Sequence, residues 1–460
     1  MHFDLIIIGA GSGNTIPGPE MDGWRIAIVE RDRFGGTCLN RGCIPSKMLI
    51  YAAEVRQIVK EAGRFGIGAT VGPVDWDGIL QRVYGRIDPI AESGAAYRRS
   101  LPNVTVFHGD ARFTGERTLT VGGEEISGDR IVLAAGARTF VPPIPGLADV
   151  PFHTSDSLLR IDHLPRHLVV LGGGFIATEL GHVFESLGSE VTIINRGAAL
   201  LQQEDADVSR RFTEVAAERF DLVLGASVDE VRQDGEDIVV RVHTADGERE
   251  VRGDTLLVAT GRVPNGDQLD VAVAGVALDD KGRVLTDAHG CTSAPGIYAL
   301  GDIVGRHQLK HMANSDARVI RHNLLHPDDL AQIDERPAPH AVFTSPQIGA
   351  IGLTEAEAVA QGIAHVAIIH DYSSSAFGWA LEDTTSFVKL IGSPETGRLL
   401  GAHVIGPQAS VLVQLLVQGM HLGNTIEELA RGQIYIHPAL TEVVEQGLLK
   451  LLDAMAAQPA

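Results

Sequence analysis

Residues 3–14 read FDLIIIGAGSGN, an apolar run that ends in three closely spaced glycines. An unbroken apolar run is typical of a buried strand in a parallel sheet. A second predicted strand, residues 25–30, ends at an acid, Glu30. In a dinucleotide-binding fold the glycines allow a tight turn and close approach of a pyrophosphate, and an acid about 20 residues on binds a ribose hydroxyl. The stretch therefore predicts a doubly wound α/β domain that binds a dinucleotide through Gly9, Gly11, Gly13 and Glu30.

The segment behind these glycines departs from the usual pattern at two points. Asn14 stands where the third glycine is expected, and residues 17–19 read PGP. Proline inside a helix removes a hydrogen bond and breaks or kinks it. We therefore expect a short or bent first helix, with a weaker dipole at the phosphate.

A second pattern of the same kind begins at residue 167, where the sequence reads HLVVLGGGFIATE. The next strand, residues 191–194, is followed by Asn195 and Arg196 rather than by an acid. An arginine beside that position favours a ribose 2′-phosphate, hence NADPH over NADH. The alternative is that Arg196 is only an exposed loop residue, which leaves NADH possible.

Residues 35–47 read GGTCLNRGCIPSK and hold two of the three cysteines in the chain. Pro45 suits the first turn of a helix, so Cys43 is expected at the positive helix end, where the thiol pKa falls. Cys38 is expected in a looser, glycine-flanked approach. A zinc site or two inert thiols are the alternatives, but zinc needs four ligands and no second cysteine pair exists. The stretch therefore predicts a redox-active pair and no metal.

The length and net charge of the chain limit the classes of function that it can have. With 460 residues the chain is expected to form two to four domains. The net charge of −21 argues against nucleic acid or an anionic membrane as the main partner. No signal peptide precedes the first strand, and few cysteines suit a reducing compartment, so we expect a cytoplasmic protein.

Three further segments, residues 131–136, 256–261 and 296–302, are predicted strands that end in small residues. The first two close the two dinucleotide units, and the third returns the chain to the first unit. From about Pro337 onwards, alternating strands and long apolar helices predict an α+β domain with an interface. Two dinucleotide sites beside a thiol pair indicate a flavin bound at the first site and a nicotinamide at the second.

Taken together, these motifs resemble the FAD-dependent pyridine nucleotide–disulfide oxidoreductases, in the family's order and over essentially the whole chain. The carrying motifs are GGTCxNxGCxPxK, the two glycine patterns, ATG at 259–261, GD at 301–302 and HPxxxE at 437–442. Within this family, four segments are most similar to the branch that reduces mycothione, the disulfide of mycothiol. They are GSGN at 11–14, GRIDPI at 85–90, GWALEDT at 378–384 and ARGQ at 430–433.

The resemblance implies an α/β fold with two Rossmann-like domains, for FAD and NAD(P), and a C-terminal α+β dimerisation domain. The expected division is an FAD-binding part at 1–152, an NAD(P)H-binding domain at 153–268, a return to the FAD domain at 269–336, and a dimerisation domain at 337–460. It also implies a homodimer whose active site, for a small disulfide substrate, is shared between subunits.

The resemblance also assigns roles to single residues. Cys43 is the flavin-facing sulfur, and Cys38 is the thiol that attacks the substrate. Lys47 and Glu179 form an ion pair beside the flavin, and His437 with Glu442 forms an acid–base dyad. The expected FAD contacts are Gly9, Gly11, Gly13, Glu30, Gly36, Thr37, Lys47, Ala135, Gly136, Gly301 and Asp302. The expected NADPH contacts are Gly172, Gly174, Phe175 (as an aromatic gate over the flavin), Ile176, Glu179, Arg196 and Gly261. Cys291 is expected to be a bystander.

Several relatives in the family remain as alternatives. Dihydrolipoamide dehydrogenase shares the LNxGC form, but it usually has an acid where Asn195 stands and a Gly-Glu-Met run where residues 407–411 read PQASV. Glutathione reductase uses basic residues where 14–19 read NTIPGP. Mercuric and large thioredoxin reductases need C-terminal cysteine or selenocysteine, and the tail at 455–460 has none. Outside the enzymes, the alternative is a non-catalytic, redox-sensing flavoprotein.

Overall fold

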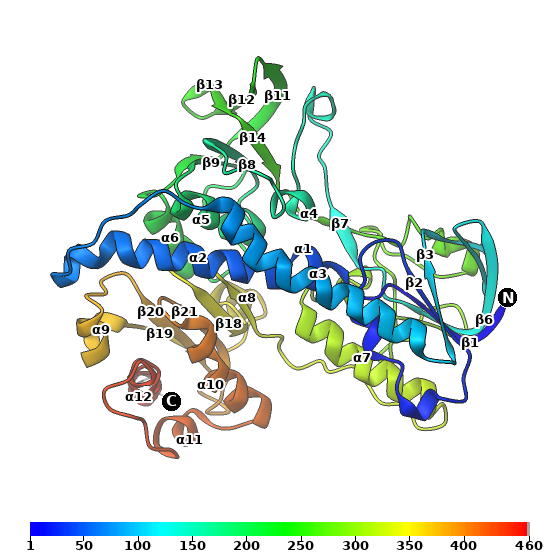
Figure 1. The fold of residues 1–460 in the computed structure, drawn as a ribbon. Coiled ribbons are helices and arrows are strands. Elements are labelled where there is room, and N and C mark those ends of the chain that lie inside the picture. The colour runs from blue at the N-terminus through cyan, green and yellow to red at the C-terminus, as the bar shows by residue number, and fades with distance from the viewer. Residues whose placement is uncertain (458–460) are drawn as a thin grey trace.

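A computed structural model describes residues 1–457 of the chain, so the last three residues of the cysteine-free tail lie outside the described range. Three main sheets organise the molecule, and α2 and α3 run side by side along it (Figure 1). Within residues 1–457, no helix is both long and apolar enough to cross a membrane.

The first sheet has seven strands, in the order β3-β2-β1-β6-β5-β4, with β16 added beside β6. β16 runs parallel to β6 and pairs Ile297 with Ile131, so the chain returns to this sheet as the sequence predicts. The strands are β1 (His2–Ile8), β2 (Ile26–Glu30), β3 (Val104–His108), β4 (Ala111–Gly115), β5 (Thr118–Val121), β6 (Glu124–Leu133) and β16 (Ile297–Ala299).

The helices around this sheet are α1 (Gly36–Arg41), α2 (Cys43–Glu61), α3 (Trp76–Ser100) and α7 (Lys310–Leu325). Where a helix usually follows the first glycines, the chain instead makes two 3₁₀ turns, at Gly13–Thr15 and Pro19–Met21. The first helix was expected to be short or bent, and in the structure two 3₁₀ turns replace it.

The position expected for Cys38 was wrong. Gly35 and Gly36 adopt φ values of +103° and +69°, which turn the chain sharply, and the short helix α1 starts immediately. Cys38 therefore lies inside a helix rather than in a loose loop. Cys43 is the first residue of α2, close to its expected position at the helix end.

The second sheet has four parallel strands in the order β10-β9-β8-β14, and it is built from one continuous segment. A three-stranded sheet, β11-β12-β13, and a two-stranded sheet, β15-β7, were not expected from the sequence. The elements are β7 (Ala137–Thr139), α4 (Ser155–Leu158), β8 (His167–Leu171), α5 (Phe175–Leu187), β9 (Glu190–Asn195), α6 (Ala206–Ala216), β10 (Asp221–Leu224), β11 (Ser227–Asp234), β12 (Asp237–Thr244), β13 (Gly247–Gly253), β14 (Thr255–Val258) and β15 (Arg262–Pro264).

The third sheet has five antiparallel strands in the order β17-β18-β21-β20-β19. This confirms the predicted antiparallel C-terminal unit, although strand β21 was missed. The elements are β17 (His340–Val342), β18 (Ile348–Gly352), α8 (Glu355–Ala360), β19 (Val366–Asp371), α9 (Ala376–Ala380), β20 (Phe387–Gly392), β21 (Leu399–Ile405), α10 (Ala409–Leu422), α11 (Ile426–Arg431) and α12 (Thr441–Ala456).

Candidate active site

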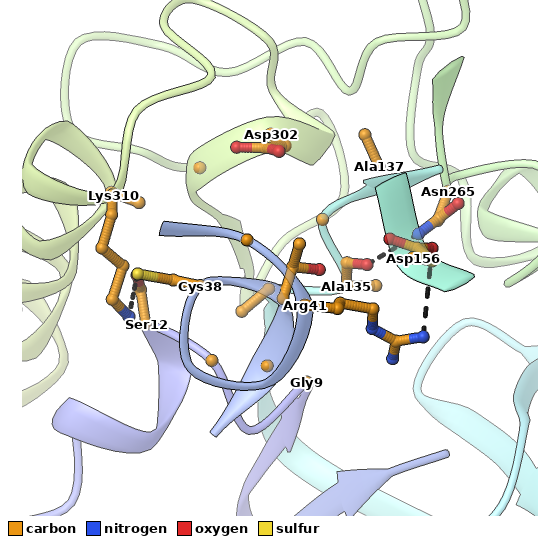
Figure 2. Close-up of a pocket in the computed structure, with 18 of the residues that line it drawn as sticks. Gly9, Ser12, Cys38, Arg41, Ala135, Ala137, Asp156, Asn265, Asp302 and Lys310 are labelled. Carbon is orange, nitrogen blue, oxygen red and sulfur yellow. Dashed lines mark hydrogen bonds and ion pairs between the residues drawn. The ribbon is translucent and has the colours of Figure 1, made fainter. Parts of the chain in front are cut away.

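One cavity collects most of the residues that the sequence assigns to FAD (Figure 2). Its wall is formed by strand ends of the first sheet together with α1, α2, α5 and the start of α7. The predicted residues that line it are Gly9, Gly11, Glu30, Gly36, Thr37, Lys47, Ala135, Gly136, Gly301 and Asp302. Gly13 is not among them. A Cβ there would lie 2.8 Å from side-chain atoms of Ala134 and Ile7, so Gly13 serves close packing.

Bare backbone forms part of the cavity wall. A Cβ on Gly36 would lie 2.7 Å from the Cα of Gly11, and a Cβ on Gly9 would lie 2.2 Å from the carbonyl oxygen of Ala134. Glycine is required here both for space and, at Gly9 and Gly36, for positive φ. A wall without side chains fits the close approach of a pyrophosphate such as that of FAD.

Glu30 is held at the rim of the cavity by backbone groups. Its carboxylate accepts hydrogen bonds from the N–H of Ala10, at 2.9 Å, and from the N–H of Asp32, at 3.0 Å. A carboxylate fixed in this way suits recognition of a ribose hydroxyl.

Cys38 and Cys43 both line the cavity, and both are unpaired thiols in the structure. The hydrogen bond with Cys38 lowers the pKa of Cys43 to about 7, against its burial, and the charge of Lys47 adds to this. The same hydrogen bond raises the pKa of Cys38. The first proton therefore leaves Cys43, and a substantial fraction of Cys43 is thiolate near neutral pH.

Lys47 and Glu179 join α2 to α5. The ammonium Nζ lies 2.7 Å and 3.0 Å from the two carboxylate oxygens of Glu179, and it stands 4.5 Å from the centre of the Phe343 ring. The N–H of Phe343 also donates to Glu179, at 2.9 Å. Burial raises the pKa of Glu179, whereas the charge and hydrogen bond of Lys47 oppose that rise. The expected ion pair between Lys47 and Glu179 is thus present. Phe343, which directly follows β17, adds a backbone hydrogen bond to the carboxylate.

Two further charged contacts lie in the cavity wall. Asp302 lies 3.5 Å from the guanidinium of Arg262, and burial raises the pKa of its carboxyl. Arg41, between the two cysteines, extends to Asp156, 3.9 Å away (Figure 2). The wall therefore carries charge of both signs around the bare backbone.

Only some of the residues predicted at the second glycine loop line the cavity. Phe175, Ile176 and Glu179, on the first turns of α5, line the cavity, whereas Gly172, Gly174, Arg196 and Gly261 do not. Arg196 is exposed, on a loop that Asn195 fastens by donating from Nδ2 to the carbonyls of Gly197, at 3.2 Å, and Ala199, at 2.9 Å.

His437 and Glu442 form a pair but do not reach the cysteines within one chain. The Nδ1 of His437 lies 2.8 Å from Oε1 of Glu442. Neither residue lines the cavity, and the imidazole is 74% exposed. Two neighbouring apolar side chains, Ile434 and Ile436, are 99% and 74% exposed. The exposed imidazole of His437 therefore follows two apolar side chains that the described part of the chain leaves uncovered, whereas Glu442 is mostly buried.

Sequence reasoning missed three residues of this cavity and its surroundings: Phe343, Arg41 and Lys310. Phe343 acts through its backbone, which carries no sequence signal. Arg41 lies between the two cysteines, and an arginine at that position does not by itself indicate which group it contacts. Lys310 is the first residue of α7, and its Nζ donates to Ser12 Oγ at 3.0 Å. A lysine in the first turn of a helix is electrostatically unfavourable, which is the same signal that drew attention to Lys47.

No group of three or more His, Cys, Asp or Glu side chains in residues 1–457 is arranged to hold a metal ion.

Comparisons with known proteins extend over the whole chain. The chain is 48% identical to mycothione reductase of Mycobacterium tuberculosis, covering 98% of this chain and 99% of the relative. It is 33% identical to dihydrolipoyl dehydrogenase of Haloferax volcanii, over 96% and 94% of the two chains. The HOCl-induced flavoprotein disulfide reductase RclA of Escherichia coli matches with a TM-score of 0.85 and 28% identity, over 99% of this chain and all of the other.

Family models agree with these similarities. Residues 3–317 match the pyridine nucleotide-disulphide oxidoreductase model, and residues 338–447 match the dimerisation domain of the same family. Members of this family are enzymes that use FAD and NAD(P)H to reduce or oxidise disulfides. The chain therefore belongs to the FAD-dependent pyridine nucleotide-disulphide oxidoreductases.

Proposed function

We propose that this enzyme reduces mycothione to two molecules of mycothiol, with NADPH as the electron donor. The overall reaction, NADPH + H⁺ + RSSR → NADP⁺ + 2 RSH, balances in atoms and electrons. The observation that carries the substrate assignment is the 48% identity, over nearly the full length, to a protein named mycothione reductase. The cavity that holds both cysteines supports the chemistry.

The cavity residues support a division of labour between two cofactors. We infer that the bare wall of Gly9, Gly11 and Gly36, with Glu30 and Asp302, holds FAD, and that Thr37, Ala135, Gly136 and Gly301 complete this contact. When bound there, FAD carries electrons from the nicotinamide to the cysteine pair. The α5 loop would hold NADPH, with Arg196 facing the 2′-phosphate and Phe175 at the opening between the two cofactors.

The steps at sulfur follow from the positions of the chain's own residues. Lys47 and the α2 N-terminus stabilise the Cys43 thiolate, while Cys38 becomes the attacking thiol. His437 of the partner subunit takes the proton of Cys38, and Glu442 of the partner subunit orients that imidazole. Cys38 then attacks the substrate disulfide, and the imidazolium protonates the first departing thiolate. Finally, the Cys43 thiolate attacks Cys38, which re-forms the disulfide and releases the second product as a thiolate. The H⁺ of the overall reaction protonates this thiolate.

A homodimer is required by this scheme, because His437 does not line the cavity of its own chain. The exposed Ile434 and Ile436 beside it support burial against a second copy. We also propose that the domains divide at 1–152, 153–268, 269–336 and 337–460, since the second sheet lies wholly within the second of these ranges.

The test is NADPH consumption by the purified holoenzyme with mycothione, glutathione disulfide and lipoamide offered in parallel. We expect kcat/KM for mycothione to exceed the other two values by at least about 100-fold. A site whose buried polar groups hydrogen-bond one substrate rejects analogues that leave those groups unpaired. Preferred turnover of lipoamide with NADH would instead assign the dihydrolipoamide dehydrogenase reaction. Absence of turnover with all three would refute the proposal.

The role of Cys43 has its own spectroscopic test. A thiolate in contact with the oxidised flavin produces a long-wavelength charge-transfer band in the two-electron-reduced enzyme. We expect Cys43→Ser to lose this band and turnover, whereas Cys38→Ser keeps the band and loses turnover. A band that survives in Cys43→Ser would exchange the two roles.

A further inference from the structure

Lys310 places a second ammonium in the active-site cavity. It is the first residue of α7, and Nζ donates to Ser12 Oγ at 3.0 Å. Both Lys310 and Ser12 line the cavity. Among the ion pairs formed within residues 1–457, Lys47 has a carboxylate partner at 2.7 Å but Lys310 has none. Since the positive helix end disfavours a cation, this position needs an anion to balance it.

One group in the cavity that can supply this anion is the thiol of Cys38. Figure 2 shows Lys310 and Ser12 on the same side of the cavity as the Cys38 sulfur. The charge of Lys310 acts to lower the pKa of Cys38, against the larger rise caused by Cys43. Each of the two sulfurs thus has its own lysine: Lys47, one turn into α2, for Cys43, and Lys310, at the start of α7, for Cys38.

Two other titratable groups interact with Cys38 or Lys310. Cys43, on α2, faces Cys38 directly. Asp302, which follows β16, is near enough for the charge of Lys310 to lower its pKa, but burial raises that pKa and Arg262 also offsets its charge. Because Arg262 already offsets the charge of Asp302, Lys310 remains available to a further anion.

We propose that Lys310 stabilises the thiolate of Cys38, so that the attacking sulfur is activated by a charge from its own subunit as well as by a base. Its part in turnover rests on the proposed function, in which Cys38 attacks the substrate. The electrostatic effect itself does not, because it is measured on Cys38 alone.

The test follows the alkylation of Cys38 by iodoacetamide as a function of pH. The parent is the holoenzyme carrying Cys43→Ser, which removes the coupled thiol, and modification is quantified at Cys38 by peptide mass spectrometry so that Cys291 does not interfere. Lys310→Met is compared with Lys310→Arg, which keeps the charge, and with Lys281→Met, which removes an exposed lysine that does not line the cavity.

We expect Lys310→Met to slow alkylation near neutral pH by roughly three- to tenfold and to move the midpoint of the profile upwards, as loss of one nearby charge does. Lys310→Arg and Lys281→Met should follow the parent. An unchanged profile in Lys310→Met would overturn the proposal, and a changed flavin spectrum with an unchanged profile would assign the lysine to the flavin instead.

Lys310→Gln separates charge from hydrogen bonding, because an amide can still donate to Ser12. A profile like that of the parent in Lys310→Gln would overturn the charge proposal, even if Lys310→Met folds poorly. Failure of the parent enzyme to turn over any disulfide would refute the proposed function but would leave this measurement valid.

Discussion

The two glycine loops of this enzyme have similar sequences and different surroundings. The loop at Gly172 leads into a regular helix, α5, and most of its predicted contacts remain outside the cavity. The loop at Gly9 leads into two 3₁₀ turns, and Gly36 from α1 closes against it. Both loops pack against a distant strand end, Gly9 on Ala134 and Gly172 on Ala259, but only the first is also closed by a further segment, at Gly36.

This difference indicates how firmly each site holds its cofactor. A binding site walled by several elements of the core releases its ligand only if those elements move, which suits a resident flavin. An open loop at the start of a helix suits a nucleotide that binds and leaves in each turnover.

The largest expected effect is loss of flavin from the enclosed loop. In Gly36→Ala the new methyl group would meet the Cα of Gly11 at 2.7 Å, at a backbone φ of +69°. We expect the purified variant to lack bound flavin, measured as the ratio of flavin to protein absorbance. Gly174→Ala in the open loop meets nothing within 4 Å and should retain flavin. Equal flavin content in both variants would contradict the comparison.

The ion pair between Lys47 on α2 and Glu179 on α5 gives the next effect. Lys47→Met leaves the nearly buried Glu179 without its cation, which we expect to lower the unfolding free energy at neutral pH by about 2–3 kcal/mol. This is less than full burial implies, because Lys47 is 35% exposed. Denaturant unfolding measures it.

The pH dependence of that loss has a definite sign. Burial raises the pKa of Glu179 above its unfolded value, so its stability contribution is complete at low pH and falls as pH rises through the raised pKa. Without Lys47 the pKa rises further. The deficit of Lys47→Met should therefore be small near pH 5 and grow towards pH 7. The double variant Lys47→Met, Glu179→Gln should lose this dependence.

A third test changes only the open loop. Arg196→Ala removes the exposed guanidinium that faces the proposed 2′-phosphate. We expect kcat/KM for NADPH to fall by about 10- to 100-fold while the value for NADH stays constant, since a charge-assisted contact is lost for one nucleotide only. Steady-state kinetics with both nucleotides decide this, and an equal fall for both would assign Arg196 a structural role.

The smallest effect concerns the 3₁₀ turns of the enclosed loop. Arg98 donates from Nε to Oδ1 of Asn14 at 2.7 Å and from a terminal nitrogen to its carbonyl at 2.5 Å. Asn14→Ala keeps the second bond, and we expect a loss of about 1 kcal/mol in unfolding free energy with flavin retained. Loss of flavin in this variant would show that the side chain of Asn14 supports the site directly.

Much of the fold was predictable because its signals are local. The glycine loops need only a strand, a turn and spacing, and they placed β1, β8 and the start of α5 correctly. The central strand β21 was missed because residues 399–405 are mostly buried and apolar, so the alternation that marks a surface strand is absent. The hairpins of 227–253 carry many charges, and their pairing partners could not be inferred from spacing.

The candidate site was predictable to a smaller extent, because its contacts join distant segments. Nothing in the sequence near Glu179 indicates that the N–H of Phe343 donates to it, or that Lys310 meets Ser12. The helix around Cys38 was missed because consecutive glycines usually indicate a loop, whereas here they provide the turn from which the helix starts. The second subunit was expected from the family resemblance and not from any spacing within the chain.

The return of β16 to β6 also constrains the order of folding. The second sheet is complete once the ribosome has released Val258, because its four strands are consecutive apart from hairpins. The first sheet, begun with the first residues synthesised, has to wait for Ile297 to pair with Ile131. Long-range pairing of this kind is slow and leaves an edge exposed in the interval. The enclosed cavity includes Gly301 and Asp302, which directly follow this strand, so it cannot be complete before the return segment has been synthesised.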